Sequence, residues 1–161
     1  MGILEPHGRG RGLLRRASLT AASSDPVILI YSLDQAVAAL TAAARAGRSI
    51  VLASAPDAGG YVGPGWFAAL TAAARGAVPE ARFSAWLDCG DNVGAALAAI
   101  RAGVEGVIFT GRADVARRLA KIARQHGVNF QTGRSRRALD LGEDFFAAPQ
   151  VVERRCAQFL G

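Results

Sequence analysis

Two acids, a thiol and two glycines lie close together in the segment "WLDCGDNVG" at residues 86–94. Asp88 can transfer protons or bind a cation, and Cys89 carries a thiol that can bind a metal or act as a nucleophile. A nucleophilic thiol needs a base nearby, and neither His7 nor His126 is placed in the sequence to supply one. We therefore consider Asp88 the catalytic candidate and Cys89 a weak candidate for a metal ligand.

Asp57 adds a third carboxylate from the preceding loop, and with Asp88 and Asp91 it could line a pocket that binds a cation or a polyol. The alternative is structural. Asp91 or Asn92 would cap the following helix, because a side-chain acceptor there satisfies an unpaired backbone N–H. In that case Cys89 is a small, half-buried residue and backbone donors hold Asp88. The sequence leaves both interpretations open.

Two Gly-Arg pairs also follow apolar runs, in "TGR" at 110–112 and in "QTGRSRR" at 131–137. Gly111 with Arg112, and Arg134 after its own glycine, offer free backbone N–H groups beside a guanidinium, which is a plausible binding site for an anion. The alternative is a pair of tight turns with solvated arginines. We consider Asp57, Asp91, Gly111, Arg112 and Arg134 the candidate ligand-binding residues.

The elements that must position these residues alternate regularly. Short apolar runs predict strands at 27–31, 50–54, 83–87, 106–110 and 128–131. Helical patterns follow at 65–75, 93–102 and 113–125, after a first helix that Ser32 and Gln35 would open as a capping box and Gly47 would end. Pro149 is expected to open a final helix. This alternation predicts right-handed βαβ units and a parallel sheet, in which all strands end at the same edge.

Five such units permit two architectures. One is a partial TIM-type barrel, a half barrel of about five parallel βα units, and the other is a flavodoxin-like open three-layer sandwich. The segments divide into a flexible basic tail at 1–24, a βα region at 25–147 and a C-terminal helix at 148–161. The tail alternates glycine with arginine and then turns to serine, threonine and alanine, a composition with little surface to bury.

The chain of 161 residues is 51% apolar and 20% charged, which is typical of one globular domain. Its net charge of +6 favours an anionic partner such as an anionic metabolite. Aromatic and basic residues do not alternate as they do in proteins that bind single-stranded nucleic acids, which argues against nucleic acid as the main partner.

No apolar run approaches the roughly 18–20 residues that span a bilayer, so we expect no membrane partner. Cys89 and Cys156 are too few for a disulfide scaffold, and we expect a cytoplasmic protein whose thiols stay reduced.

Residues 31–133 resemble the first half of the class II, zinc-dependent fructose-bisphosphate aldolase barrel. The matching stretches are "LDQAVAAL", "IVLASAPDAGGYVGPGWFAALTAAA", "WLDCGDNVGAALAAIRAGVEGVIFTGR" and "HGVNFQ". The corresponding family segments contain Leu-Glu-Gln, Ser-Pro-Gly-Ala, Leu-Asp-His-Gly, Ile-Asp-Gly-Ser and His-Gly-Val in the same order. The resemblance favours the half barrel over the sandwich.

The resemblance also implies roles for single residues. Asp88 matches the family's catalytic aspartate, whereas Cys89 stands where the family has a zinc-binding histidine. Further matched positions depart from the family: Ala55 replaces a substrate-binding serine, Thr110 an aspartate and Gln131 a glutamate. The family's other zinc ligands and its phosphate loop lie in later strands without a counterpart here. A catalytic zinc needs three protein ligands, so we expect no cofactor, with zinc only under an enzymatic alternative.

We therefore expect a catalytically degenerate, aldolase-like half barrel that acts as a ligand-binding or protein-interaction module. The alternative is a metal-assisted aldehyde-lyase or isomerase that uses Asp88 as its acid/base. Whether the chain is an enzyme stays open on sequence, with an active aldolase the less favoured answer. A strand arc leaves two open edges, so we also expect self-association into a dimer or higher oligomer.

Overall fold

The computed structural model describes residues 24–161, so the predicted tail lies outside it except for Ser24. The strands are β1 (Val27–Ile30), β2 (Ser49–Ser54), β3 (Arg82–Asp88), β4 (Gly106–Phe109), β5 (Asn129–Thr132) and β6 (Ala138–Asp140). The helices are α1 (Leu33–Arg45), α2 (Ala58–Tyr61), α3 (Gly63–Ala77), α4 (Val93–Ala102), α5 (Ala113–Gln125) and α6 (Pro149–Leu160), with a 3-10 turn, η1 (Gly142–Asp144).

The strands form one parallel sheet in the order β5-β4-β3-β2-β1-β6, which confirms the predicted parallel α/β fold. From β1 to β5 the neighbours are consecutive in sequence, as they are in a (βα)8 barrel. A flavodoxin-like sheet has the order 2-1-3-4-5, which would place β3 beside β1. Here β2 and β6 occupy both sides of β1, so the strand order is that of a partial barrel.

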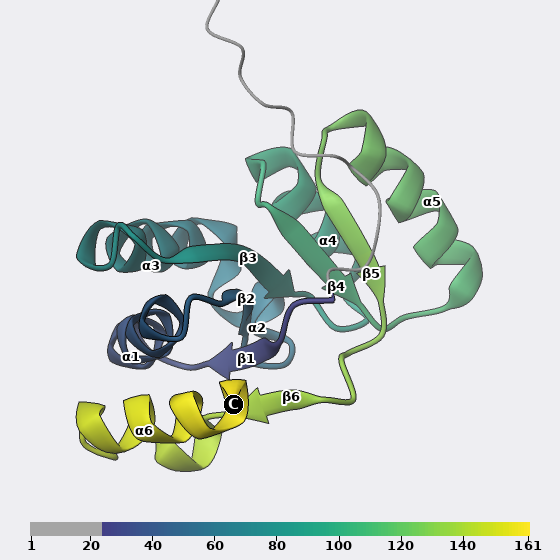
Figure 1. Ribbon diagram of the computed structural model, residues 1–161. Coiled ribbons are helices and arrows are strands. Elements are labelled where there is room, and N and C mark those ends of the chain that lie inside the picture. The colour runs from purple at the N-terminus through teal and green to yellow at the C-terminus, as the bar shows by residue number, and fades with distance from the viewer. Residues whose placement is uncertain (1–23) are drawn as a thin grey trace, which may run out of the picture.

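The helices follow the same order as the strands, and they lie on the outside of the sheet (Figure 1). Contacts join α6 to α1, α1 to α3, α3 to α4, and α4 to α5. In a doubly wound sandwich the helices would be split between two faces and would not form one continuous row. The described part of the chain therefore has its helices in a single outer layer.

The connection between the two edge strands shows that the sheet is strongly curled. Only residues 133–137 join β5 to β6, although these strands lie at opposite edges. A connection of this length spans at most about 20 Å. The edges of a flat six-stranded sheet are about 24 Å apart. The connection must also run back along the length of a strand, from the end of β5 to the start of β6, so a flat sheet would need an even longer connection. The connection therefore crosses the concave side of a curved sheet (Figure 1).

Both faces of the sheet are apolar, as expected for parallel strands buried between two layers. Most of the core lies between the sheet and the helices, where Ile28, Leu52 and Val107 are fully buried. A smaller cluster, centred on Val51 and Trp86, covers the concave face. Ser135 of the β5–β6 connection shares a small cavity with that cluster, so the connection fills part of what would be the interior of a barrel.

Several local predictions are confirmed. Ser32 caps α1 by accepting a hydrogen bond from the backbone N–H of Gln35 at 3.2 Å, and Gly47 adopts a left-handed φ of 63° just after the helix. The other half of the expected capping box differs, because Gln35 Oε1 accepts from the backbone N–H of Tyr31 and not from that of Ser32. The final helix opens at Pro149 as expected. The segment before α3 differs from the prediction, because part of the expected loop forms the short helix α2. The strand β6 was not predicted at all. Among residues 24–161, no helix is long and apolar enough to cross a bilayer.

Candidate functional site at the carboxyl ends of the strands

Asp88 is the last residue of β3, and its side chain points to the concave face, on the same side as that of Trp86. Only 2% of the residue is exposed. Its backbone N–H donates to Ser54 Oγ at 2.9 Å, which ties the end of β3 to the end of β2. The carboxylate therefore lies at the mouth of the half barrel, as the position at a strand end predicts.

Both oxygens of the Asp88 carboxylate are engaged by other parts of this chain. Arg134 Nε donates to Oδ2 at 2.7 Å, and Arg134 Nη2 donates to Oδ1 at 3.1 Å. The backbone N–H groups of Asp57 and Gly90 also donate to Oδ1, at 3.0 and 2.9 Å. A bidentate arginine with two backbone donors is a strong, geometrically specific arrangement for a carboxylate. Asp88 thus holds three segments of the fold together.

Arg134 lies in the β5–β6 connection and joins Asp88 to a second acid. Its Nη2 donates to Asp57 Oδ1 at 2.9 Å as well, so one guanidinium bridges two carboxylates. The hydrogen bond to Asp88 is the main cause of a raised pKa of Arg134, and burial opposes it. Asp57 has a φ of 62° and is the one non-glycine residue with a left-handed backbone in the described chain. The ion pairs therefore hold an unusual loop conformation.

A pocket of about 260 Å³ opens beside this cluster. Its floor is apolar, formed by Val27, Leu29, Ala53 and Ile108 of the sheet. Its remaining wall comes from the following residues, which include the buried acid: Ser54, Pro56, Asp88, Arg134, Ser135, Arg136, Ala138 and Asp140. The pocket therefore combines an apolar base with charges of both signs. We refer to it below as the mouth pocket.

Cys89 points to the opposite side of the sheet from Asp88. It is 1% exposed and packs among Ala58 and Leu87 in the core beneath the helices. Burial, followed by the charge of Asp88, raises the pKa of Cys89 to about 12. A thiol that is buried in the core on the other side of the sheet from Asp88, and whose pKa is raised this far, is a poor metal ligand.

No three His, Cys, Asp or Glu side chains within residues 24–161 are grouped so that they could hold a metal. The described residues therefore do not fit the catalytic zinc that the aldolase resemblance implies.

The predicted ligand-binding residues are only partly brought together. Asp57 and Arg134 meet at Asp88, but Asp91 is exposed and opens on a separate pocket of about 270 Å³ beside Tyr61. Asn92, rather than Asp91, caps α4, because its Oδ1 accepts from the backbone N–H of Ala95 at 2.9 Å. The structural alternative for this segment is thus confirmed for Asn92.

Gly111 and Arg112 do not contribute to the mouth pocket. The guanidinium of Arg112 pairs with Asp114 through two contacts of 3.1 Å on the surface of α5. A Cβ at Gly111 would lie 2.4 Å from the ring of Phe109, so close packing explains this glycine. The structure gives no support to an anion site at these two residues.

Asp140 was not predicted as a site residue, and it lies on the unpredicted strand β6. It lines the mouth pocket, and its carboxylate interacts with the Tyr31 hydroxyl. Burial, followed by this contact, raises the pKa of Tyr31 to about 12. The sequence signal that could have revealed β6, and with it Asp140, is the alternation of apolar and polar residues in "ALD" at 138–140, but this segment is too short to be recognised as a strand.

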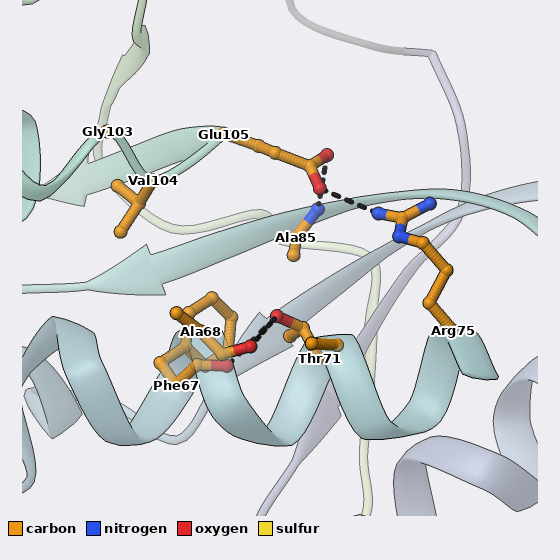
Figure 2. A pocket seen from close by; sticks show the side chains of 9 residues that line it. Phe67, Ala68, Thr71, Arg75, Ala85, Gly103, Val104 and Glu105 are labelled. Atoms are coloured by element: carbon orange, nitrogen blue, oxygen red, sulfur yellow. Dashed lines mark hydrogen bonds and ion pairs between the residues drawn. The ribbon is translucent and has the colours of Figure 1, made fainter. Parts of the chain in front are cut away.

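A further pocket of about 210 Å³ lies outside the sheet, between α3 and the loop before β4 (Figure 2). Arg75 and Glu105 form an ion pair of 2.7 Å at its rim, and Glu105 Oε2 also accepts from the backbone N–H of Ala85 at 3.2 Å. The lining consists otherwise of small and apolar residues, and it contains none of the predicted site residues. This pocket is a gap in the helix layer.

Comparisons with known proteins agree with the barrel-like strand order. No family model matches the sequence, and no curated protein matches it. A solved structure of a proposed fructose-1,6-bisphosphate aldolase from Coccidioides immitis is similar to this chain, with a TM-score of 0.55 and 16% sequence identity. The likeness covers 67% of this chain and 45% of that one, so this chain spans less than half of that structure's length. The fold of this chain is therefore aldolase-like.

Proposed function

We propose that this chain is a catalytically degenerate, aldolase-like half barrel that binds a small ligand or a protein partner and does not cleave carbon–carbon bonds. The observation that carries the proposal is the state of Asp88. The resemblance makes this residue the acid/base, yet both of its carboxylate oxygens accept hydrogen bonds from the chain itself. An acid/base must instead reach the proton that it moves, at about 2.6–3.2 Å from the substrate atom.

The residues at the expected metal site also support a protein without aldolase activity. Cys89 replaces the expected zinc-binding histidine, and its side chain lies in the core rather than beside Asp88. Arg134 places a positive charge directly on the carboxylate, where it neutralises the group without offering an open coordination position. The alternative function, a metal-assisted lyase or isomerase, would require both residues to reorganise.

The mouth pocket supports a small ligand. Its volume of about 260 Å³ is slightly below the usual range for ligand sites, which begins near about 300 Å³. Arg136 lines the pocket and has no ion-pair partner among residues 24–161. Its guanidinium beside an apolar floor suits a small anionic metabolite with a short hydrocarbon body.

Two further expectations belong to the same proposal. Cys89 and Cys156 are both free and buried, which suits a cytoplasmic protein in a reducing environment. The strands β5 and β6 each pair on one side only, which supports self-association through an open edge.

The test is an assay for cleavage of fructose 1,6-bisphosphate by the full chain, with and without added zinc. We expect the wild type and Asp88→Asn to give the same rate as the buffer. Zinc-dependent turnover that is lost in Asp88→Asn and kept in Asp91→Asn would contradict the proposal. Asp91 is the matched control because it is an exposed acid of the same loop outside the mouth pocket.

Ligand binding is tested in the same protein by titration with inorganic phosphate, followed through backbone amide shifts. We expect shifts at Ser135 and Asp140, which Arg136→Gln weakens by roughly tenfold because it removes the unpaired guanidinium. Arg101→Gln, on the far end of α4, should leave them unchanged. Equal shifts in both variants would remove the mouth pocket as the anion site.

A further inference from the structure

The basic side chains that have no partner within the described chain are concentrated on one helix. Among residues 24–161, eight basic side chains form neither an ion pair nor a side-chain hydrogen bond, and they are Arg101, Arg117, Arg118, Lys121, Arg124, Arg136, Arg137 and Arg154. Four of the eight lie on α5, and all four are exposed. We call Arg117, Arg118, Lys121 and Arg124 the basic face of α5.

The basic face lies opposite the stripe with which α5 packs into the core. That stripe consists of Ala116, Leu119 and Ala123, which are all buried. At about 100° per residue, the four cations cover about 120° of the helix circumference, on the side away from the stripe. They extend about 10 Å along the helix axis, from Arg117 to Arg124. Because α5 forms the outer end of the helix row, this side is open to a partner (Figure 1).

The elements around the basic face supply no acid that could pair with it. Asp114 of α5 is held by Arg112 through two contacts of 3.1 Å, and Glu105, in the loop before β4, is held by Arg75 at 2.7 Å. The elements α4 and β5, which pack against α5, contain no acid. Five other described acids form no ion pair, and all lie outside α4, α5 and β5: Asp34, Glu80, Asp91, Asp140 and Glu143.

The spacing of these cations lowers the stability of their own helix. Arg117 and Lys121 are four positions apart, and Lys121 is three positions from both Arg118 and Arg124. Residues at these spacings are neighbours on a helix, and like charges there destabilise it. A helix with a purely structural role gains from an acid at one of these positions, and residues 115–125 contain none. The four cations therefore fit an anionic partner that lies along the helix.

A nucleic acid duplex matches the shape of the basic face. A duplex carries one phosphate charge per about 1.7 Å of its axis, so a length of about 10 Å presents about six phosphates. Cations that cover a wide arc of a helix suit a groove, because the two strands place phosphates on both of its sides. A flat lipid surface would meet only the middle of the arc, and α5 exposes no large apolar residue that could enter it.

We propose that the basic face of α5 binds the phosphate backbone of double-stranded nucleic acid without reading its sequence. Arginine supplies three of the four cations, and its planar guanidinium binds phosphate oxygens in pairs. The lack of alternating aromatic residues argues against base stacking on single strands, but contacts to duplex phosphates need no aromatic side chain. Arg136 lines the mouth pocket on the concave side of the sheet, whereas α5 lies on the outside, so the proposal does not depend on what that pocket binds.

The experiment measures binding of the full chain to a DNA duplex of random sequence by fluorescence anisotropy, between about 50 and 200 mM salt. Four phosphate contacts predict that the logarithm of the binding constant falls against log[salt] with a slope of about −3.6, or steeper where other cations of the chain add to it. Arg117→Gln/Lys121→Gln should reduce the magnitude of this slope by about 1.8, because two contacts are lost. Arg118→Gln/Arg124→Gln should give the same reduction.

The matched control is Arg137→Gln/Arg154→Gln, which removes two exposed cations without ion pairs from outside α5 and should leave the slope unchanged. Glutamine is a good helix former, so we expect thermal midpoints of the α5 variants at or above that of the wild type. An equal reduction of the slope in the control would overturn the proposal, because binding would then follow net charge alone.

An unchanged slope in both α5 variants would also overturn it. The same holds for a wild type that does not bind the duplex but binds vesicles of phosphatidylserine and phosphatidylcholine through α5, since the partner would then be a membrane surface. The aldolase assay and the phosphate titration of the mouth pocket are independent of all these results.

Discussion

At the scale of single residues, this chain uses its buried polar groups to hold its own loops in place. Within residues 24–161, no buried side-chain nitrogen or oxygen lacks a hydrogen-bond partner. Asp88 receives four hydrogen bonds from three segments, and Gln35 joins Tyr31 to Leu141. Groups that are fully satisfied internally stabilise the native arrangement, and they have little capacity left for substrates.

The two buried thiols predict a loss of stability at alkaline pH. The pKa of Cys89 is raised to about 12 and that of Cys156 to about 11, mainly by burial. In the unfolded chain a thiol titrates near about 8.5. The unfolded state therefore loses these protons first. The thiol contribution is intact below about pH 8.5 and is lost as the pH rises toward 11–12.

Urea unfolding at several pH values between about 8 and 10 checks this expectation, since each thiol should remove up to about 1.4 kcal/mol per pH unit. The double variant Cys89→Ala/Cys156→Ala should show a smaller pH slope than the wild type, whatever its absolute stability. Identical slopes in the two proteins would show that the thiols do not titrate in this way.

At the scale of elements, the sequence predicts best what depends on neighbouring residues. The apolar runs of β1 to β4, the cap at Ser32 and the start of α6 at Pro149 are all local signals, and the structure confirms them. The strand β6 has three residues and pairs with β1 from more than a hundred positions away, so no local period reveals it. The helix α2 is a single turn in a segment rich in glycine, a residue that disfavours helices.

Gln35 of α1 connects the end of β1 to the residue that follows β6. Its Nε2 donates to the carbonyl of Leu141 at 2.7 Å, and its Oε1 accepts from the backbone N–H of Tyr31 at 2.8 Å. We expect Gln35→Met to lower the unfolding free energy by about 2–4 kcal/mol, because both backbone groups lose a partner while the volume stays similar.

Hydrogen exchange should show faster opening at residues 138–144 in Gln35→Met than in the wild type. Ser32→Ala is the comparison variant, since it removes only the helix cap and should cost about 1 kcal/mol. An equal loss in both variants, with no local change at β6, would mean that Gln35 acts on α1 alone.

At the scale of the whole molecule, the curl of the sheet decides which predicted site residues meet. The sequence places Asp57, Asp88 and Arg134 after separate strands, and a shared edge was enough to predict that Asp57 and Asp88 lie near one another, whereas Arg134 was assigned to a separate anion site. It could not predict that Arg134 would neutralise Asp88, because this depends on a connection that folds back across the concave face. The outward direction of Cys89 also follows from the register of β3, in which alternate side chains face opposite layers.

The account's central claim is that Asp88 serves the fold and not a reaction, and its contribution to stability tests this most directly. Asp88→Asn keeps the shape but removes the buried charge with which Arg134 pairs, so we expect urea unfolding to show a loss of about 1.5–3 kcal/mol. Residues kept for catalysis often carry strain, and replacing them tends to leave stability unchanged or to raise it. A measured unfolding free energy of Asp88→Asn equal to or above that of the wild type would contradict the account.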